Sequence, residues 1–319
     1  MEFGDLADGV LTGNRRSVGR AISLIENEGP AMAILLRRLY PHTGHAYRIG
    51  LTGPPGAGKS TLADELIRVI RQHGLTVGVI AVDPNSPFSG GAVLGDRIRM
   101  MRHSSDLGVY IRSMGARGHL GGLARAADNA ALILDAMGED VILLETVGVG
   151  QSELEIAGTA DTTVVVIPPG AGDGVQAIKA GIMEIADVFV VNKADHPQAN
   201  KAVAEIRDLL RMDVSPGPWT PPIVKTIATQ NEGLEELWKR IEQHRLYLEE
   251  SGLLDRRRRL RLERTIRQLA ERKMREQYLE PRFDSAEFQR MLDDVVERRS
   301  DPYDIAERIA EPPSATARK

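Results

Sequence analysis

A phosphate-binding pattern, G-x-x-x-x-G-K-[ST], is fitted by the stretch Gly53-Pro54-Pro55-Gly56-Ala57-Gly58-Lys59-Ser60-Thr61. Glycine permits backbone conformations that turn successive N–H groups toward a phosphate. The Lys59 side chain is long enough to reach the β- and γ-phosphates, and the Ser60 hydroxyl suits Mg²⁺. The stretch therefore predicts a nucleotide site; the alternative is a glycine-rich turn that binds nothing.

A second pattern predicts that the base is guanine. Asn192-Lys193-Ala194-Asp195 fits N-K-x-D and follows the apolar run Val188–Val191. The Asp195 carboxylate can accept two hydrogen bonds from the ring N–H and exocyclic amine of guanine, which adenine does not offer. Ile227-Ala228-Thr229 follows a later apolar run and is expected to contact the base. The alternative for Asp195 is a surface acid at a capped strand end.

Three acids are candidates for holding a metal ion and a water molecule. Asp83 and Glu145 each end an apolar run, and Asp96 lies in Leu94-Gly95-Asp96-Arg97. Each has an alternative role as a helix cap or a salt-bridge partner. Gln151 lies three residues past Gly148 rather than next to it, which departs from the arrangement in which a glutamine orients the attacking water.

The segments Ser113–Gly122 and Pro168–Gly181 are rich in glycine. Each is expected either to move with the nucleotide state or to be a flexible connection.

Composition excludes several classes of protein. The 319 residues carry a net charge of −4, so the whole molecule has no nucleic-acid footprint. Without cysteine there is neither a disulfide framework nor a thiolate metal site. No apolar run reaches the roughly 18 residues that span a bilayer, and the N-terminus does not resemble a signal peptide. We expect a cytoplasmic protein that binds neither nucleic acid nor membrane.

The spacing of apolar runs predicts an α/β fold, a P-loop NTPase with a mostly parallel central sheet flanked by helices. In such sheets ligands bind at the carboxyl ends of the strands, where Gly53, Asp83, Glu145 and Asn192 fall. Residues 1–46 are expected to form an N-terminal helical extension, 47–250 the nucleotide domain, and 251–319 a C-terminal helical arm. The predicted strands are Tyr47–Thr52, Val77–Val82, Asp140–Glu145, Thr162–Ile167, Val188–Asn192 and Ile223–Ile227.

The predicted arm begins near four consecutive arginines, Arg256 to Arg259, and continues as a charged helix that Pro281 is expected to break. A second helix, capped by Ser285, is expected to run to about Arg299. Two helices without a sheet make a poor core, so we expect the arm to pack on a partner subunit. The arginines indicate either an interaction surface or a solvated helix face. Residues after Pro312 are expected to be disordered.

Taken together, the motifs resemble those of the MeaB/ArgK/MMAA GTPases, chaperones of adenosylcobalamin-dependent acyl-CoA mutases and chiefly of methylmalonyl-CoA mutase. The resemblance covers roughly residues 10 to 250 closely, and Glu145-Thr146-Val147-Gly148-Val149-Gly150-Gln151-Ser152-Glu153 is its most specific piece. It also rests on Val-Asp-Pro-Asn-Ser at 82–86, Leu-Gly-Asp-Arg-Ile-Arg-Met at 94–100 and Pro-Gly-Ala-Gly-Asp at 169–173.

The resemblance implies a role for each motif. Residues Gly53 to Thr61 would bind the phosphates of GTP, and Ser60, Asp83, Asp96 and Glu145 would form the Mg²⁺ and water network. Lys59 would stabilise the transferring phosphoryl group. Asn192, Lys193 and Asp195 would recognise guanine, with Ile227 to Thr229 closing on it.

The resemblance also implies a homodimer that gates cofactor loading into a mutase and helps to rescue the inactivated enzyme. Residues 170–181 would couple partner binding to hydrolysis. The chain lacks the Asp-x-His-x-x-Gly motif, so it is not expected to carry cobalamin itself.

Three rival functions stay open from the sequence. The first is an ATP-dependent kinase linked to amino-acid transport, against which the Asn192–Asp195 motif argues. The second is a metal-insertion GTPase for nickel, which would require a cluster of Cys or His residues to relay the metal. The third is a binding module whose nucleotide is only structural.

Overall fold

The computed structural model describes residues 3–27, 31–83, 101–115, 120–146, 158–170, 183–211 and 217–311. The chain divides into two compact units, Met1–Asp255 and Arg256–Lys319. In the described ranges, every helix is too short or too polar to traverse a lipid bilayer.

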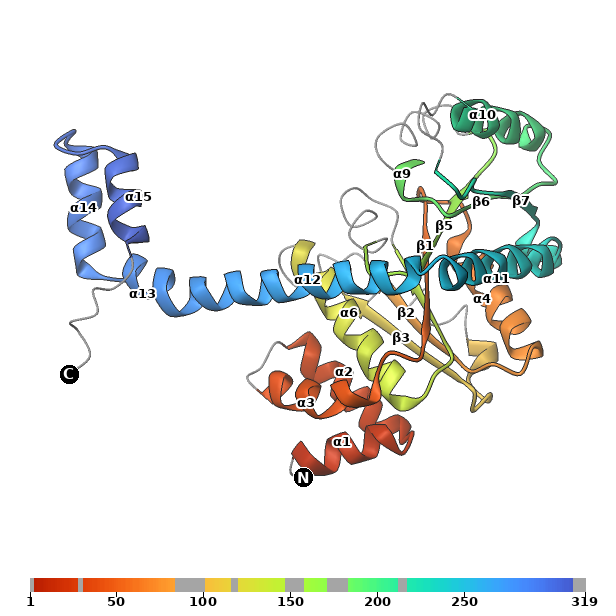
Figure 1. The fold of residues 1–319 in the computed structure, drawn as a ribbon, viewed down its shortest axis with the longest axis horizontal. Helices are drawn as coiled ribbons and strands as arrows, with labels where there is room; N and C mark the ends of the chain where they lie inside the picture. The colour runs from red at the N-terminus through yellow and green to blue at the C-terminus, as the bar shows by residue number, and fades with distance from the viewer. Residues whose placement is uncertain are drawn as a thin grey trace. The chain divides into compact units, whose positions relative to one another are not determined.

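The first unit is built on a seven-stranded parallel sheet with the strand order β3-β2-β4-β1-β5-β6-β7 (Figure 1). Every residue of β1, β4, β5 and β6 is buried, which explains why apolar residues predominate in them. The charged exception in β1 is Arg48, which pairs with Asp128 at 2.6 Å. The predicted parallel sheet flanked by helices is confirmed. The strands are β1 Tyr47–Thr52, β2 Val77–Asp83, β3 Val109–Gly115, β4 Val141–Glu145, β5 Thr162–Ile167, β6 Val188–Asn192 and β7 Ile223–Thr226.

Strand β3 lies at an edge of the sheet and is not predicted by the apolar runs. Its sequence, Val-Tyr-Ile-Arg-Ser-Met-Gly, places Arg112 and Ser113 in mid-strand, and both are only half-buried. The interpretation of Ser113–Gly122 as one glycine-rich connection is therefore wrong at both ends. Ser113–Gly115 belongs to β3, and α6 begins at Leu120.

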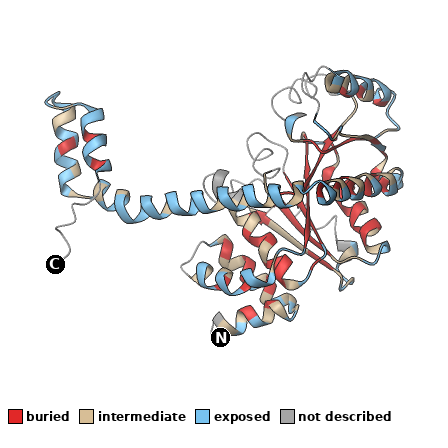
Figure 2. Ribbon diagram, viewed as in Figure 1, coloured by how far each residue is buried: buried red, intermediate tan, exposed pale blue. Residues whose placement is uncertain are grey.

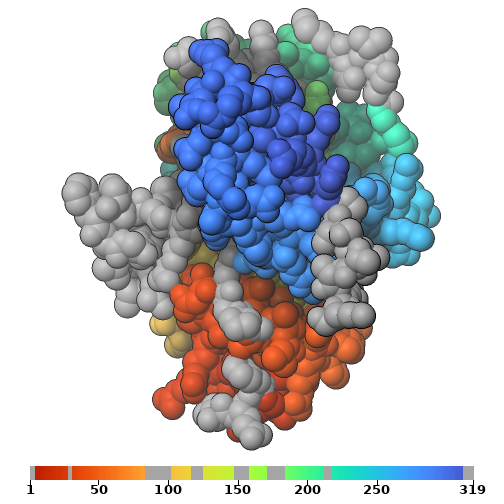
Figure 3. All heavy atoms as spheres, turned by 90° about the vertical axis from the view of Figure 1, so that its left-hand side faces the viewer, coloured from red at the N-terminus to blue at the C-terminus, as the bar shows by residue number. Residues whose placement is uncertain are grey.

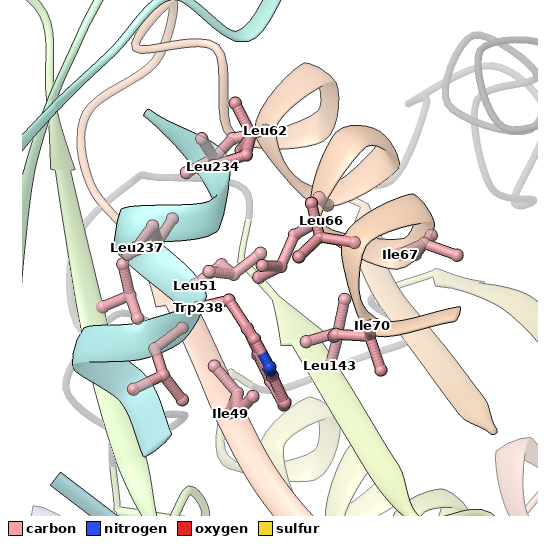
Figure 4. Packing of buried hydrophobic residues seen from close by; sticks show 14 of the residues in the cluster. Ile49, Leu51, Leu62, Leu66, Ile67, Ile70, Leu143, Leu234, Leu237 and Trp238 are labelled. Carbon is pink, nitrogen blue, oxygen red and sulfur yellow. The ribbon is translucent and has the colours of Figure 1, made fainter. Parts of the chain in front are cut away.

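Helices cover both faces of the sheet. On one face, α4 (Lys59–Gln72) and α11 (Leu234–Glu250) pack their apolar sides against alternate residues of the strands (Figure 4). On the other face, α6 (Leu120–Met137) covers β2 to β4, and α10 (Ala199–Arg211) covers β5 and β6. Helix α4 ends as predicted, because Gly74 follows its C-terminal cap with a φ of 80°.

The N-terminal helices pack on α6 and complete that second face. They are α1 Phe3–Leu11, α2 Arg15–Glu26 and α3 Ala31–Leu39, followed by the short helix η1 Tyr40–His42. The Asn14 side chain caps α2 by accepting hydrogen bonds from two backbone N–H groups. Val18, Ile22 and Ile25, which the helical spacing singles out, are all buried, whereas Ile34 is exposed.

A buried polar row ties α11 to the amino ends of three strands. The Tyr47 hydroxyl lies 2.5 Å from the Thr162 hydroxyl, which lies 2.8 Å from Nδ1 of His244. Nε2 of His244 lies 3.2 Å from the carboxylate of Asp187. These residues are at most 6% exposed, and burial raises the pKa of the Tyr47 hydroxyl above its usual value. The row fixes the end of the first unit remote from the phosphate-binding loop.

The second unit consists of helices with a small core of its own. Helix α12 (Leu253–Met274) enters this unit at Arg256, and none of its described residues is buried (Figure 2). Met291 of α14 (Ala286–Val296) packs with Ile305 and Ile309 of α15 (Pro302–Ala310). The atoms of these two helices are the dark blue spheres in Figure 3. Helix α15 is not predicted by the sequence analysis.

Of two local predictions for the second unit, the helix cap at Ser285 is confirmed and the helix break at Pro281 is wrong. Ser285 is the N-terminal cap of α14, as predicted. The α-helical winding of α12 stops at Met274 rather than at Pro281, and a π-helical turn, Arg275–Leu279, follows. Pro281 then lies in the first turn of α13 (Glu280–Phe283), where a missing N–H is tolerated.

Glu139 is a buried carboxyl group whose charge the fold disfavours. It is 4% exposed and packs beside Gly78, and burial raises its pKa from 4.5 to about 7. Because the folded pKa is the higher one, the stability that the bound proton contributes is complete below pH 4.5. That stability is lost as the pH rises through about 7.

The Glu139→Gln variant should therefore be more stable than the wild type at pH 8, by about 1–3 kcal/mol, and should lose most of that advantage near pH 5. Urea unfolding at the two pH values measures the difference. Glu242→Gln, which removes an exposed carboxylate from α11, is the control and should show no such pH dependence. An advantage that is equal at both pH values would contradict the assignment.

Candidate nucleotide site

The phosphate-binding loop connects β1 to α4, and two of its glycines are required by their surroundings. Gly53 has a φ of 136°, and a Cβ there would lie 2.0 Å from the carbonyl oxygen of Val166. Gly58 has a φ of 87°, and a Cβ there would lie 2.5 Å from Nδ2 of Asn192. A side chain at either position would displace a neighbouring strand end, so the loop keeps its close approach only with glycine.

Lys59 begins α4 and is 6% exposed. Its Nζ donates hydrogen bonds to the carbonyl oxygens of Gly53 at 2.7 Å and Pro54 at 3.1 Å. The amine is therefore held over the loop formed by Gly53 to Thr61. A phosphate in that loop would lie beside a fixed positive charge and the N-terminus of α4.

Ser60 and Glu145 form an oxygen pair beside the loop. The Ser60 hydroxyl donates a hydrogen bond of 2.6 Å to Oε1 of Glu145, which is 4% exposed at the end of β4. Strand β4 lies between β1 and β2, so Glu145 stands at the carboxyl edge next to the strand that leads into the phosphate-binding loop. A hydroxyl and a carboxylate are the hard oxygen donors that Mg²⁺ prefers, so these two residues fit that ion.

The other predicted acids are placed only in part. Asp83 ends β2, the strand next to β4, so its backbone lies at the same edge as Glu145; its side chain lies outside the described structure. Asp96 lies within 84–100, outside the described residues. Pro168–Gly170 is described and follows β5, whereas residues 171–181 are outside the description.

Asn192 joins the predicted guanine motif to the phosphate-binding loop. It ends β6, is 2% exposed, and its Nδ2 donates a hydrogen bond of 2.9 Å to the carbonyl oxygen of Ala57. Its Oδ1 accepts from the Thr226 hydroxyl at 3.1 Å and from the backbone N–H of Ala228 at 3.2 Å. The Asn192 amide therefore holds the phosphate-binding loop, through Ala57, and the chain after β7, through Ala228, at the end of β6. Thr226 is a residue that the sequence analysis missed, because nothing in its local pattern indicates a partner on β6.

Lys193 and Asp195 lie at the surface of the same turn. Lys193 has a φ of 56°, and its Nζ donates to the carbonyl oxygen of Gly56 at 2.8 Å. The N–H of Ala194 donates to the carbonyl oxygen of Thr226 at 3.0 Å, and the Asp195 side chain is exposed. The exposed Asp195 therefore belongs to a turn that Asn192 and Lys193 attach to the phosphate-binding loop.

The loop after β7, residues 227–233, closes on itself next to Asn192. The N–H groups of Ile227 and Glu232 each donate to the other residue's carbonyl oxygen, at 3.1 and 3.2 Å. Ala228 and Thr229 lie in a short helix, η4 (Ala228–Gln230), with Ala228 buried and Thr229 exposed. The predicted base-contacting residues are thus adjacent to the Asn192–Asp195 turn.

These loops, a parallel sheet and a G-x-x-x-x-G-K-[ST] turn between β1 and α4 define a P-loop NTPase. The sequence profile of the family described as "Methylmalonyl Co-A mutase-associated GTPase MeaB" matches residues 18–282. The chain belongs to the MeaB family, and it is a GTPase, a hydrolase acting on GTP.

Relatives extend over most of the chain. A putative GTPase of Pyrococcus abyssi is 50% identical over 310 residues, which cover 96% of this chain and 95% of the relative. The GTPase ArgK of Escherichia coli is 38% identical over 252 residues, 76% of each chain. A crystal structure described as a LAO/AO transport system kinase is similar with a TM-score of 0.72 and 27% identity, covering 97% of this chain and 96% of that one.

Replacing Gly58 with alanine should weaken GDP binding by about tenfold or more, because the new Cβ would push the Asn192 amide away from Ala57. Gly56→Ala is a matched control. Gly56 also has a positive φ, 76°, but a Cβ there meets nothing within 4 Å. Both variants carry the backbone cost of about 1–2 kcal/mol. Titration with a fluorescent GDP analogue separates them, and equal losses would argue against the collision with Asn192.

Proposed function

We propose that this GTPase depends on Mg²⁺ and acts as the chaperone of an adenosylcobalamin-dependent acyl-CoA mutase, most specifically methylmalonyl-CoA mutase. The observation that carries the hydrolytic part is the pairing of Ser60 with Glu145 beside Lys59. The chaperone part is supported by the family description, which names a mutase-associated GTPase. In this role the chain gates cofactor loading and helps to protect and reactivate the mutase.

Each residue of the site has a proposed part in hydrolysis. Backbone N–H groups of Gly53 to Thr61 bind the phosphates, and Lys59 neutralises the charge that develops on the transferred phosphoryl group. Ser60 and Glu145, with Asp83 and Asp96, would hold Mg²⁺ and orient the attacking water. When bound, the ion would neutralise part of the negative charge of the phosphates. The products are GDP and phosphate.

Recognition of guanine is assigned to the turn at Asn192, Lys193 and Asp195 and to the loop Ile227–Thr229. The exposed Asp195 carboxylate accepts from the guanine ring N–H and amine. The backbone N–H of Ala228 bonds to Asn192, which keeps the loop Ile227–Thr229 beside that turn. One similar structure is described as a LAO/AO transport system kinase, and the rival function proposed here is an ATP-dependent kinase linked to amino-acid transport. The N-K-x-D turn favours GTP over ATP here. It therefore argues against an ATP-dependent kinase.

We place the protein in the cytoplasm, where it meets its client, and we assign it no bound cobalamin. A metal-insertion GTPase is the weaker alternative, because the chain has no cysteine to relay a soft metal ion.

GTP turnover by the purified protein, with and without methylmalonyl-CoA mutase, tests the proposal. We expect slow turnover alone, a clear rise when the mutase is added, and loss of turnover on chelation of Mg²⁺. Lys59→Ala is the blank, because it removes the amine from the phosphate-binding loop and should abolish both rates.

A fast turnover rate that changes neither on addition of the mutase nor on chelation of Mg²⁺ would contradict both the chaperone and the Mg²⁺ assignments. A mutase-independent rate that still needs Mg²⁺ would contradict the client alone.

We further propose that residues 251–319 form a dimerisation arm. Leu262, Ile266 and Leu269 recur at i, i+4 and i+7 on α12, and they are 42%, 65% and 43% exposed. Apolar residues at this spacing form a stripe on one side of a helix. A second copy of the arm would cover this stripe and remove its apolar area from water.

Ile266→Glu should convert the dimer to a monomer or weaken its association by about tenfold or more, since it puts a charge in the apolar stripe. Light scattering after size-exclusion chromatography measures the mass over a range of concentrations. Gln268→Glu adds the same charge on another side of α12 and should leave the mass unchanged. Equal masses for both variants and the wild type at every concentration would place the subunit contact elsewhere.

A further inference from the structure

Helix α4 connects the phosphate-binding loop to a second part of the site. Two side chains on it, Glu65 and Arg68, form an ion pair of 3.2 Å, and they are 13% and 31% exposed. Arg68 also donates a hydrogen bond through its second guanidinium nitrogen to Oδ1 of Asn231. Asn231 belongs to the loop after β7, far from α4 in sequence, so this bond joins the two elements directly.

Asn231 occupies the position at which that loop reverses. It has a φ of 59°, and its N–H donates to the carbonyl oxygen of Ala228 at 3.3 Å. Two residues later Gly233 has a φ of 78°, and a Cβ there would lie 2.1 Å from the carbonyl oxygen of Lys225. Asparagine adopts left-handed backbone more readily than most residues, so Asn231 suits this turn. Its side chain is then free to accept the bond from the Arg68 guanidinium outside the loop.

We propose that Arg68, oriented by Glu65, is a positioning residue for the loop 227–232 and thereby for recognition of the guanine base. This inference rests on the proposed base contact of that loop. Lys59 and Arg68 are nine residues apart on α4, about 13 Å along the helix axis. The loop is therefore attached near the start of α4 through Asn192 and again, two and a half turns later, through Arg68.

Glu65 has a second arginine partner, which makes a controlled comparison possible. Arg102 of η2 (Met101–His103) lies 2.8 Å from Oε1 of Glu65 and 2.7 Å from the carboxylate of Asp64. Arg68 instead approaches Oε2 of Glu65. Removing Arg102 takes a cation from the same carboxylate but leaves the bond between Arg68 and Asn231 in place. Removing Arg68 breaks that bond.

Hydrogen exchange of the backbone amides in 227–232 tests this assignment without nucleotide. We expect Arg68→Ala to speed exchange in that loop about threefold to tenfold, and Glu65→Gln to do so to a smaller extent. Arg102→Ala should leave the loop within about twofold of the wild type. Amides of β1 and β6 should be unchanged in all three variants, which separates a local effect from general destabilisation.

Titration with a fluorescent GDP analogue is the second readout. Arg68→Ala should weaken GDP binding about threefold to tenfold, in parallel with the faster exchange. Unchanged exchange in Arg68→Ala, or equal loosening of the loop by Arg102→Ala, would overturn the positioning role. Faster exchange with unchanged GDP affinity would overturn the link to the base. A wild-type protein that fails to bind GDP would instead refute the proposed function, and the exchange comparison would still stand.

Discussion

The side-chain amide of Asn192 is the interaction on which the rest of the site depends. It is buried at the end of β6 and bonds at once to Ala57, Thr226 and Ala228. An amide is suited to this place because it donates and accepts in one plane, and an unpaired partner buried here would cost about 1–3 kcal/mol. The phosphate-binding loop and the two loops beside it are thereby held at a fixed separation, which also explains why position 58 must lack a side chain.

The sequence alone predicts the central fold well because its signals are local. The strands Tyr47–Thr52, Thr162–Ile167 and Val188–Asn192 are buried on both faces, so each is rich in apolar residues and has the predicted bounds. The phosphate-binding loop is equally local, since its positive φ values require glycine at fixed spacing. Family membership and GTP hydrolysis follow from such motifs, whereas the residues assigned to Mg²⁺ and to the base remain predictions.

The features that the sequence does not predict depend on distant partners. Strand β3 has half-buried polar residues in mid-strand and is defined by its pairing with β2. Helix α15 has few apolar residues, and two of them, Ile305 and Ile309, are buried by packing against Met291 of α14. Thr226, Arg68 and Asn231 carry no motif, and their roles emerge only when β6, β7 and α4 are brought together. Pairing across the fold, rather than any local pattern, determines these contacts.

The row of Tyr47, Thr162, His244 and Asp187 has a consequence for how the chain tolerates change. Each side chain lies within 3.2 Å of the next and all four residues are buried, so a substitution at one position removes one of its neighbour's contacts. Replacing His244 alone would leave the Thr162 hydroxyl and the Asp187 carboxylate without their shared partner. The effects of substitutions at these four positions on the free energy of unfolding should therefore not be additive, even though the residues come from four separate segments of the chain.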